Sequence, residues 1–295
     1  MELFLQFFIS GLMVGAIYAL IALGFNIVYN TTSILNLAQG EFVVTGSLVM
    51  WFFLQKLHLP YGLAILASLS VVAFVALIME RLSIAPLLKR GDFLLLILIT
   101  IAFSIFLRGI LMFLFGKDPY GFPPLVQASP LVIGGAVIQW QTLWIFFFIA
   151  IIALFLHLFF NKTLLGKAMQ ACSLDAEAAT LMGIKPSQMV MLSFILSGIF
   201  AGLAGILITP ITFMEYDKGP ILTIKGFTAA IIGGLGSNWG AMAGGFLLGI
   251  LENLLAGYVH SGLKDALALF LLIFMLLFRP SGLFQSSKGA ELRKL

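Results

Sequence analysis

The stretch GLMVGAIYALIALGFNIVYNTTSILNLAQGEF, residues 11–42, carries a long apolar run into a short polar segment and then into a second apolar run. The first run, Leu3–Tyr29, exceeds the roughly 20 residues with which a helix crosses a bilayer, and it lacks the alternation of a membrane β-strand. Backbone N–H and C=O groups in lipid need partners within their own segment, so the sequence predicts a membrane-spanning helix here. No basic region precedes the run and no small-residue cleavage site ends it, so we interpret it as a retained span and not as a cleaved signal.

The rest of the chain has the same apolar character. Of its 295 residues, 61% are hydrophobic and 9% are charged, with a mean hydropathy of +1.14, whereas soluble domains carry roughly 25% charged residues. We therefore predict an all-α polytopic membrane helix bundle, a single transmembrane domain over residues 1–295 with about eight or nine spans. The expected spans are Leu3–Tyr29, Phe42–Gln55, Tyr61–Met79, Phe93–Phe115, Gln141–Phe160, Ser187–Ile208, the short run Gly226–Leu235, Ala241–Val259 and Lys264–Phe278.

Basic residues gather in the loop 80–92, in the polar segment 161–186 and in the C-terminal tail. Because cytoplasmic loops carry an excess of Lys and Arg, we expect these segments and the C-terminus in the cytoplasm. The loops 116–139 and 209–225 and the N-terminus then lie outside, and the net charge of +4 reflects topology, not nucleic-acid binding. The basic residues concerned are Arg81, Lys89, Arg90, Lys162, Lys167, Lys185, Arg279, Lys288, Arg293 and Lys294.

The expected outer loop 116–139 has a composition of its own. It contains four of the ten prolines, and its segment LVIGGAVIQW, residues 131–140, predicts a β-hairpin around Gly134 and Gly135. A rigid outer surface of this kind suits the docking of a partner, and an ordered connector explains the pattern equally well.

Two parts of the chain echo each other weakly. GLMVGAIYAL (residues 11–20) and SGIFAGLAGI (residues 197–206) each precede a polar break and then a short, glycine-containing apolar run. In the expected topology the two copies run in opposite directions, as in transporters whose interrupted helices border the transport route.

Polar residues at membrane depth cluster near these breaks, where each costs a few kcal/mol unless it finds a partner or water. One hypothesis is a polar seam along a translocation path; for each single residue, a role as helix cap or interfacial residue is the alternative. Two of them, Ser237 and Asn238, are also expected to end the short run 226–235. The residues assigned to the path are Asn26, Asn36, Gln39, Glu41, Thr45, Thr228, Ser237 and Asn238.

Pairs of glycines four residues apart predict close contacts between helices. The pairs are Gly11 and Gly15, Gly198 and Gly202, and Gly240 and Gly244.

Motifs for catalysis, metal binding and nucleotide binding are missing from the sequence. H-E-x-x-H, G-x-S-x-G and C-x-x-C do not occur, the single Cys172 excludes an intramolecular disulfide, and His157 has no second His or Cys near it. We therefore predict neither an enzyme nor a metal site. Lys117 and Lys167 follow glycines outside any G-x-x-x-x-G-K-[ST] motif, so we expect no cofactor and no bound ATP in this chain. If ATP drives the protein, the ATPase is another polypeptide that needs a cytoplasmic contact.

The segment GKAMQACSLDAEAATLMG, residues 166–183, offers such a contact because it is helix-prone throughout. Ser173 is a candidate N-cap, with Asp175 and Glu177 in the first turn. Gly183 is the expected C-cap. The alternative is a helix lying in the lipid interface, although such helices usually have a larger apolar face and Lys or Arg flanks. The residues expected to dock an ATPase are Asp175, Glu177, Ala178, Ala179, Leu181, Met182 and Gly183.

EAATLMG, residues 177–183, fits the E-A-A-x-x-x-G core of the cytoplasmic loop of ABC importer permeases. Together with the stretches 11–42, 166–184 and 226–254, it makes the chain resemble the LivH-type permease subunit of branched-chain amino acid ABC importers. The resemblance covers nearly the whole chain, although the I-x-L-P that commonly closes the loop is absent. It implies a multi-pass permease domain in a bacterial or archaeal cytoplasmic (inner) membrane.

The resemblance also implies a set of partners. A second related permease chain pairs with such a subunit, two ABC ATPase subunits bind ATP and grip the short helix, and an extracytoplasmic binding protein delivers leucine, isoleucine or valine. Apart from these proteins, the expected contact is membrane lipid. The expected mechanism is alternating access, with specificity residing chiefly in the binding protein.

Two other functions are weighed against this one. A secondary transporter driven by an ion gradient needs intramembrane carboxylates, for which Glu41 and Glu252 are the plausible residues; the helix 166–183, which a lone carrier does not need, argues against it. A membrane enzyme lacks a catalytic set. Amides, short-chain ureas and other small polar solutes stay open as substrates.

Overall fold

The structure is a computed structural model that describes residues 2–88, 93–126, 128–133 and 135–284. Several of the basic residues used to predict the topology lie outside these ranges, as does Gly134 of the predicted hairpin. These basic residues are Lys89, Arg90, Lys288, Arg293 and Lys294.

Seven helices of the described residues are long and apolar enough to cross a membrane. The predicted all-α membrane bundle is confirmed, and the chain is a multi-pass membrane protein. The seven are α1 (Glu2–Thr32), α3 (Tyr61–Met79, continued by a π-helical turn, Glu80–Ile84, and by α4, Ala85–Leu88), α5 (Phe93–Phe115), α6 (Trp140–Lys162), α9 (Pro186–Thr212), α11 (Asn238–Tyr258) and α12 (Lys264–Phe278, after a 3-10 turn, Ser261–Leu263).

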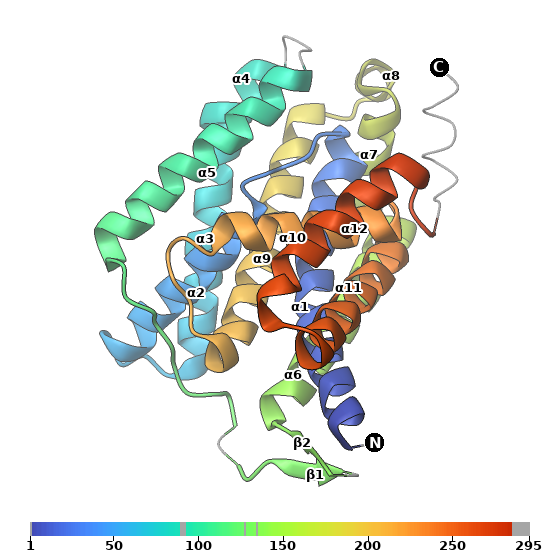
Figure 1. Cartoon of the computed structure of the whole chain (residues 1–295). Coiled ribbons are helices and arrows are strands. Elements are labelled where there is room, and N and C mark those ends of the chain that lie inside the picture. The colour runs from blue at the N-terminus through green and yellow to red at the C-terminus, as the bar shows by residue number, and fades with distance from the viewer. Residues whose placement is uncertain (1, 89–92, 127, 134, 285–295) are drawn as a thin grey trace.

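Two further helices are too short to cross alone. α2 (Gln39–Gln55) has 17 residues and α10 (Gly219–Gly233) has 15. At 1.5 Å per residue they extend about 25 and 22 Å, less than the roughly 30 Å of a hydrocarbon core. Each follows a short non-helical segment, 33–38 or 213–218, and Figure 1 shows the first of these turning back into the bundle after α1. A count of nine passes needs both short helices with their preceding segments, and it stays a prediction.

The bundle has two distinct ends, which we name by the elements that mark them (Figure 1). The hairpin end carries β1 (Leu131–Ile133), β2 (Ala136–Ile138) and the start of α1; the α8 end carries α7 (Leu164–Leu174) and α8 (Ala176–Leu181). β1 and β2 pair antiparallel with Leu131 opposite Ile138, so the predicted hairpin is confirmed. The main-chain N–H of Val137 donates to Gln6 Oε1 at 2.7 Å, which ties the hairpin to α1.

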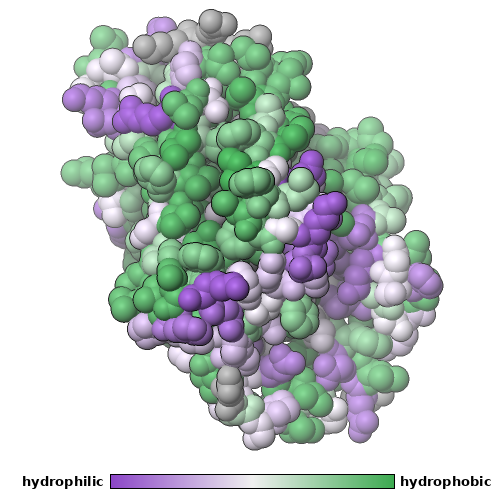
Figure 2. Space-filling model, turned by 90° about the vertical axis from the view of Figure 1, so that its left-hand side faces the viewer, coloured by the Kyte–Doolittle hydropathy of each residue, from purple (hydrophilic) through white to green (hydrophobic). Residues whose placement is uncertain are grey.

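Apolar side chains cover much of the outer surface of the bundle, as Figure 2 shows for one face. On α5, for example, the exposed fraction of Phe113 is 87%, and on α12 that of Phe278 is 73%. Such side chains are stable at a surface only where lipid or another apolar chain meets them, which agrees with membrane insertion.

Glycines bring the central helices together, as their spacing predicts. A Cβ at Gly11 or Gly15 of α1 would overlap the backbone of α11, and one at Gly244 would overlap the backbone of α10. Gly198 and Gly202 of α9 lie against α3, where an added Cβ would meet the side chains of Ala76 and Val72 most closely. These contacts allow close packing of helices in lipid, where hydrophobic burial does not drive helix association.

Two expected boundaries around α10 are wrong. The predicted loop 209–225 shrinks to 213–218, because α9 continues through Pro210 to Thr212 and α10 already begins at Gly219. Pro210 is tolerated since the helix ends two residues later, and a proline in the first turn of α10 favours a helix start. At the other end α10 stops at Gly233, so that Ser237 and Asn238 begin α11 and do not end α10.

The predicted single helix over residues 166–183 is also wrong, because it is broken at Asp175 into α7 and α8. Asp175 caps α8, its Oδ1 accepting the main-chain N–H groups of Glu177 and Ala178, both at 2.9 Å. Ser173, the expected N-cap, instead donates to the Gln170 carbonyl within α7. An aspartate is among the strongest N-caps, so the chain starts a new helix there.

Candidate functional site

The first turns of α2 and α10 meet inside the bundle. The main-chain N–H of Gly40 donates to Thr223 Oγ1 at 2.9 Å. A Cβ at Gly40 would overlap the Gly219 carbonyl, and one at Gly219 would overlap the carboxyl group of Glu41. Only glycines allow this approach, which places two helix N-termini with their partial positive charges at one point.

Glu41 brings a buried carboxyl group to this junction. Its Oε1 accepts a hydrogen bond from Ser104 Oγ of α5 at 3.0 Å. Its Oε2 is buried and has no hydrogen-bond partner among the residues that the structure describes. One turn along α2, Thr45 Oγ1 donates to the Glu41 main-chain carbonyl at 2.7 Å. An unpaired buried carboxylate oxygen is costly, so it marks a place where a further donor or cation would be stabilised.

A groove of about 520 Å³ runs between α2, α3 and α5 toward the hairpin end. Thr45 of α2 lines it near the junction, and Lys56, just past the end of α2, lines it at the hairpin end. Its volume falls within the roughly 300–1,000 Å³ typical of small-molecule sites. The walls between are apolar and include Val49, Val75, Leu107 and Leu111.

Three other residues assigned to the path use polar atoms to join elements. Asn26 Nδ2 donates to the Ser237 carbonyl at 2.9 Å, and its Oδ1 accepts the Gly236 N–H at 3.2 Å. Gln39 Nε2 donates to the Ser197 carbonyl at 3.2 Å, and its Oε1 accepts from Ser197 Oγ at 2.8 Å. Thr228 Oγ1 contacts the Ile224 and Ala268 carbonyls. Hydrogen bonds of this kind are typical of residues that join helices. A role for these three residues in the translocation path stays a prediction.

The last three lie at the edges of the same breaks. Ser237 caps α11 by accepting the Gly240 N–H at 3.1 Å. Asn36 accepts the Ala38 N–H with its Oδ1, while its buried Nδ2 lacks a hydrogen-bond partner within the described chain. Asn238 Oδ1 is likewise buried without one. The structure therefore brings Thr45 to the groove and Glu41 one turn before it on α2, with the other residues around the two breaks.

A charge cluster centred on the buried Lys225 and Glu252, with the exposed Asp265 at its edge, was not predicted from the sequence. Lys225 Nζ of α10 lies 2.5 Å from Glu252 Oε1 of α11 and 2.9 Å from Asp265 Oδ1 of α12. It also lies 5.5 Å from the centre of the Tyr18 ring on α1. Opposite charges in apolar helices must pair, so Lys225 and Glu252 could have been matched from the sequence. The cluster ties four helices together.

At the α8 end, the residues expected to dock an ATPase form a short capped helix. Leu181 and Met182 are 89% and 84% exposed, and Ala178 is exposed on the same side. Ala179 faces inward and is buried, and Gly183 has a φ of +83°, the left-handed conformation of a helix C-cap. Asp175 and Glu177 are exposed at the start of the helix. An apolar pair so exposed outside the spans is typical of a contact surface.

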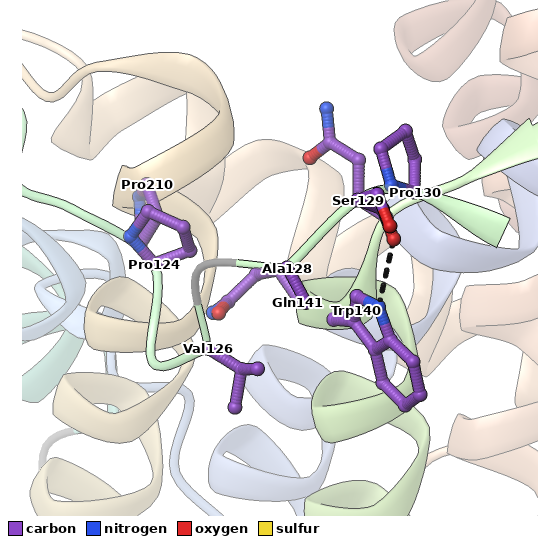
Figure 3. A pocket seen from close by; sticks show the side chains of 9 residues that line it. Pro124, Val126, Ala128, Ser129, Pro130, Trp140, Gln141 and Pro210 are labelled. Carbon is purple, nitrogen blue, oxygen red and sulfur yellow. Dashed lines mark hydrogen bonds between the residues drawn. The ribbon is translucent and has the colours of Figure 1, made fainter.

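At the hairpin end, the proline-rich segment surrounds a hollow of about 460 Å³, shown in Figure 3. Trp140 Nε1 donates to the Ser129 carbonyl at 3.0 Å, and Gln141 Nε2 donates to the Leu207 carbonyl at 2.8 Å. The second bond attaches this segment to α9. The described part of this segment is thus attached to the bundle at α9, and its use as a docking surface stays a prediction.

Metal ligands do not gather anywhere in the part of the chain that the structure describes: it holds no group of three or more His, Cys, Asp or Glu side chains arranged for an ion. His157 instead lies beside Trp239, with ring centres 5.9 Å apart.

Comparison with known proteins finds sequence similarity over nearly the whole length of the chain. The sequence profile of a family described as "Branched-chain amino acid transport system / permease component" matches residues 7–277. The protein of Pseudomonas aeruginosa named "High-affinity branched-chain amino acid transport system permease protein BraD" is 33% identical over 299 residues, 95% of each chain. The LivH permease protein of the corresponding system in Escherichia coli (strain K12) is 31% identical over 295 residues, again 95% of each chain.

A more distant relative belongs to the same kind of system. The protein of Escherichia coli (strain K12) named "High-affinity branched-chain amino acid transport system permease protein LivM" is 24% identical over 306 residues, 92% of this chain and 68% of that one. All three relatives are named as transport permeases, which confirms the prediction that the chain is not an enzyme. With its membrane bundle, its interrupted helices and a family match over residues 7–277, the chain belongs to the family of permease components of branched-chain amino acid transport systems.

Proposed function

We propose that this chain is a transmembrane permease subunit of an ATP-binding-cassette importer that moves branched-chain or similar small amino acids across the cytoplasmic membrane. The single observation that carries the proposal is the family match over residues 7–277. The exposed Leu181 and Met182 on the short capped helix support ATP-driven transport over a lone carrier, since a carrier needs no such contact.

The partners are a second permease, two ATPase subunits and an extracytoplasmic binding protein. Similarity to proteins named both LivH and LivM supports the pairing of two related permease chains. The chain has no nucleotide-binding motif, so in this proposal the ATPase subunits bind the ATP and grip α8.

The orientation of the chain in the membrane follows from the proposed contact between α8 and an ATPase. If α8 meets an ATPase, the α8 end is cytoplasmic and the hairpin end faces outward, with the N-terminus outside and the C-terminus inside. The basic residues of the segment 161–186 favour the same orientation. The membrane is then the cytoplasmic (inner) membrane of a bacterium or archaeon.

The mechanism is alternating access. ATP binding closes the ATPase dimer and moves α8, the permease pair opens toward the hairpin end and accepts the amino acid from the binding protein, and hydrolysis resets the pair. The polar residues near the breaks of α2 and α10 border the path: Asn26, Asn36, Gln39, Glu41, Thr45, Thr228, Ser237 and Asn238.

Reconstitution in liposomes tests this function. The chain, its second permease, the ATPases and the binding protein are incorporated together, and uptake of radiolabelled leucine is measured with and without ATP inside. We expect uptake only with ATP, the ATPases and the binding protein present, and no effect of collapsing ion gradients. Uptake by the single chain, driven by a sodium or proton gradient, would establish the carrier instead.

A further inference from the structure

The groove between α2, α3 and α5 is continuous with the junction of the α2 and α10 N-termini, because residues of both lie on the same faces of α2 and α5. On α2, Glu41, Thr45 and Val49 are four residues apart and therefore lie on one face. On α5, Ser104, Leu107 and Leu111 are three and four residues apart and therefore also lie on one face. Because Thr45, Val49, Leu107 and Leu111 line the groove and Ser104 donates to Glu41, the Glu41–Ser104 pair lies about one turn beyond the inner end of the groove.

The groove is long and apolar, with charge near its inner end. The distance along the α2 axis from Thr45 to Lys56 is about 16 Å, at 1.5 Å per residue. Thr45, Leu107 and Leu111 are almost fully buried. At the outer end Lys56 lies over the Trp51 ring, 5.9 Å from its centre.

The surroundings of Glu41 occupy only one of its two carboxyl oxygens. Among the residues that the structure describes, Oε1 accepts a hydrogen bond from Ser104 Oγ at 3.0 Å. A carboxylate that served only to balance the two helix N-termini would use both oxygens in hydrogen bonds, whereas Oε2 has no such partner in the described residues. The geometry therefore leaves one acceptor for a cationic group that is not part of these residues.

A zwitterionic amino acid with an aliphatic side chain matches this arrangement by charge and polarity. We propose that the groove is the amino-acid site of the outward-open permease, in which Glu41 Oε2 accepts the ammonium group and the apolar walls receive the side chain. In this proposal Arg108, one turn along α5 from Ser104, attracts the substrate carboxylate. This inference rests on the proposed function, and the groove's course toward the hairpin end agrees with entry from outside.

We expect the site to bind its substrate with low affinity, because a transported substrate must also leave. Hydrophobic contacts along a 520 Å³ groove accept leucine, isoleucine or valine with little discrimination between them. The ammonium contact discriminates more strongly, because a ligand without that group leaves the buried carboxylate oxygen unpaired.

Direct binding to the complete importer tests the proposal. The purified permease pair with its ATPases, in nanodiscs and without binding protein, is titrated with leucine, with 3-methylbutylamine and with 4-methylpentanoate. Trp51 lines the groove, and the emission that disappears in a Trp51→Phe variant reports its occupancy. We expect leucine and the amine to change this emission, and the acid, which lacks an ammonium group, to need at least a tenfold higher concentration.

Variants separate the ammonium contact from general effects. Glu41→Gln should weaken leucine and the amine at least tenfold and leave the acid unchanged. The matched control is Glu80→Gln, in the π-helical turn after α3 and outside the groove. Its buried Oε2 also lacks a hydrogen bond among the described residues, and Arg81 Nε lies 3.8 Å from it. If Glu41→Gln does not assemble, Val75→Phe fills the groove from α3 without touching Glu41 and should abolish the leucine response.

Three outcomes overturn the proposal: no Trp51-dependent response to leucine, an unchanged leucine response in Glu41→Gln, or an unchanged one in Val75→Phe. ATP-driven leucine uptake by the same wild-type preparation, with binding protein added, keeps this test apart from that of the proposed function. Uptake without a groove response defeats only the site; a wild type that transports no amino acid defeats the function.

Discussion

Gly40 and Thr223, 183 residues apart, are joined by a 2.9 Å hydrogen bond from the main-chain N–H of one to the hydroxyl of the other. The bond links the first turns of the two short helices, α2 and α10. Gly219 lies at the same junction and contacts both Gly40 and the Glu41 carboxyl group. The junction therefore depends on backbone proximity that any side chain would disturb.

Gly40→Ala should destabilise the bundle by about 1–3 kcal/mol, the usual cost of overpacking, because its Cβ would overlap the Gly219 carbonyl. The measurement is thermal unfolding in detergent, followed by size-exclusion chromatography. Gly62→Ala in α3 is the matched control, since a Cβ there meets no atom within 4 Å. The control should be neutral or slightly stabilising, because alanine favours a helix. Equal melting temperatures for wild type and Gly40→Ala would contradict the packing described.

Leu181→Asp together with Met182→Asp should abolish co-purification of the ATPases and ATP-driven uptake without lowering the melting temperature of the permease. Both side chains are over 80% exposed on α8, so the substitutions remove an apolar contact surface and no core packing. Leu164→Asp on α7, where the exposed fraction is 87%, serves as control and should retain the ATPases. Retention of the ATPases by the double variant would show that they bind elsewhere.

Lys225→Met should cost about 3–5 kcal/mol of stability, because it leaves the buried Glu252 carboxylate without its cation. The double variant Lys225→Met, Glu252→Met should lose less, since both members of the buried pair are replaced by apolar groups. Unfolding midpoints in detergent compare the two. A double variant less stable than Lys225→Met would indicate that the pair itself, and not an unpaired charge, controls stability.

Cys172 should react slowly with iodoacetamide at neutral pH. Burial raises the pKa of its thiol above the ordinary value, and only the thiolate is nucleophilic. A raised pKa means less thiolate at any pH below it, so the rate should keep rising with pH beyond the range in which an ordinary thiol levels off. Leu181→Cys in a Cys172→Ser background provides the exposed control, and alkylation is followed by mass spectrometry. Equal rates for the two thiols at pH 7 would contradict the burial.

The membrane class and most helix positions follow from the sequence, because apolar runs of about 20 residues have few alternatives in lipid. The hairpin was also predictable, since glycines between β-branched runs specify a turn. Boundaries failed around two prolines inside the expected loop 209–225: Pro210 lies in the last turn of α9, and the proline after Gly219 lies in the first turn of α10. Local residue preference cannot separate these cases, because the neighbouring helices decide them.

The candidate site was predictable only residue by residue. The sequence singles out Glu41 as a costly polar residue in an apolar region, but it does not show that Ser104 lies beside it, 63 positions further on. In the same way Asp175 was correctly placed near the start of a short helix, while its role as the cap depends on the break after Leu174. Contacts between distant segments depend on how the helices pack, and this packing cannot be predicted from the local pattern of a single sequence.

The meeting of two helix N-termini beside a carboxyl group has an electrical consequence. A helix N-terminus carries about half a positive charge, and a full charge moved across the membrane gains about 2.3 kcal/mol per 100 mV. The N-termini of α2 and α10 meet at Gly40 and Gly219, so together they amount to about one positive charge. The Glu41 carboxylate at the same junction carries one negative charge, so a rearrangement that moves the junction as a unit carries almost no net charge through the field, and the membrane voltage neither drives nor opposes it.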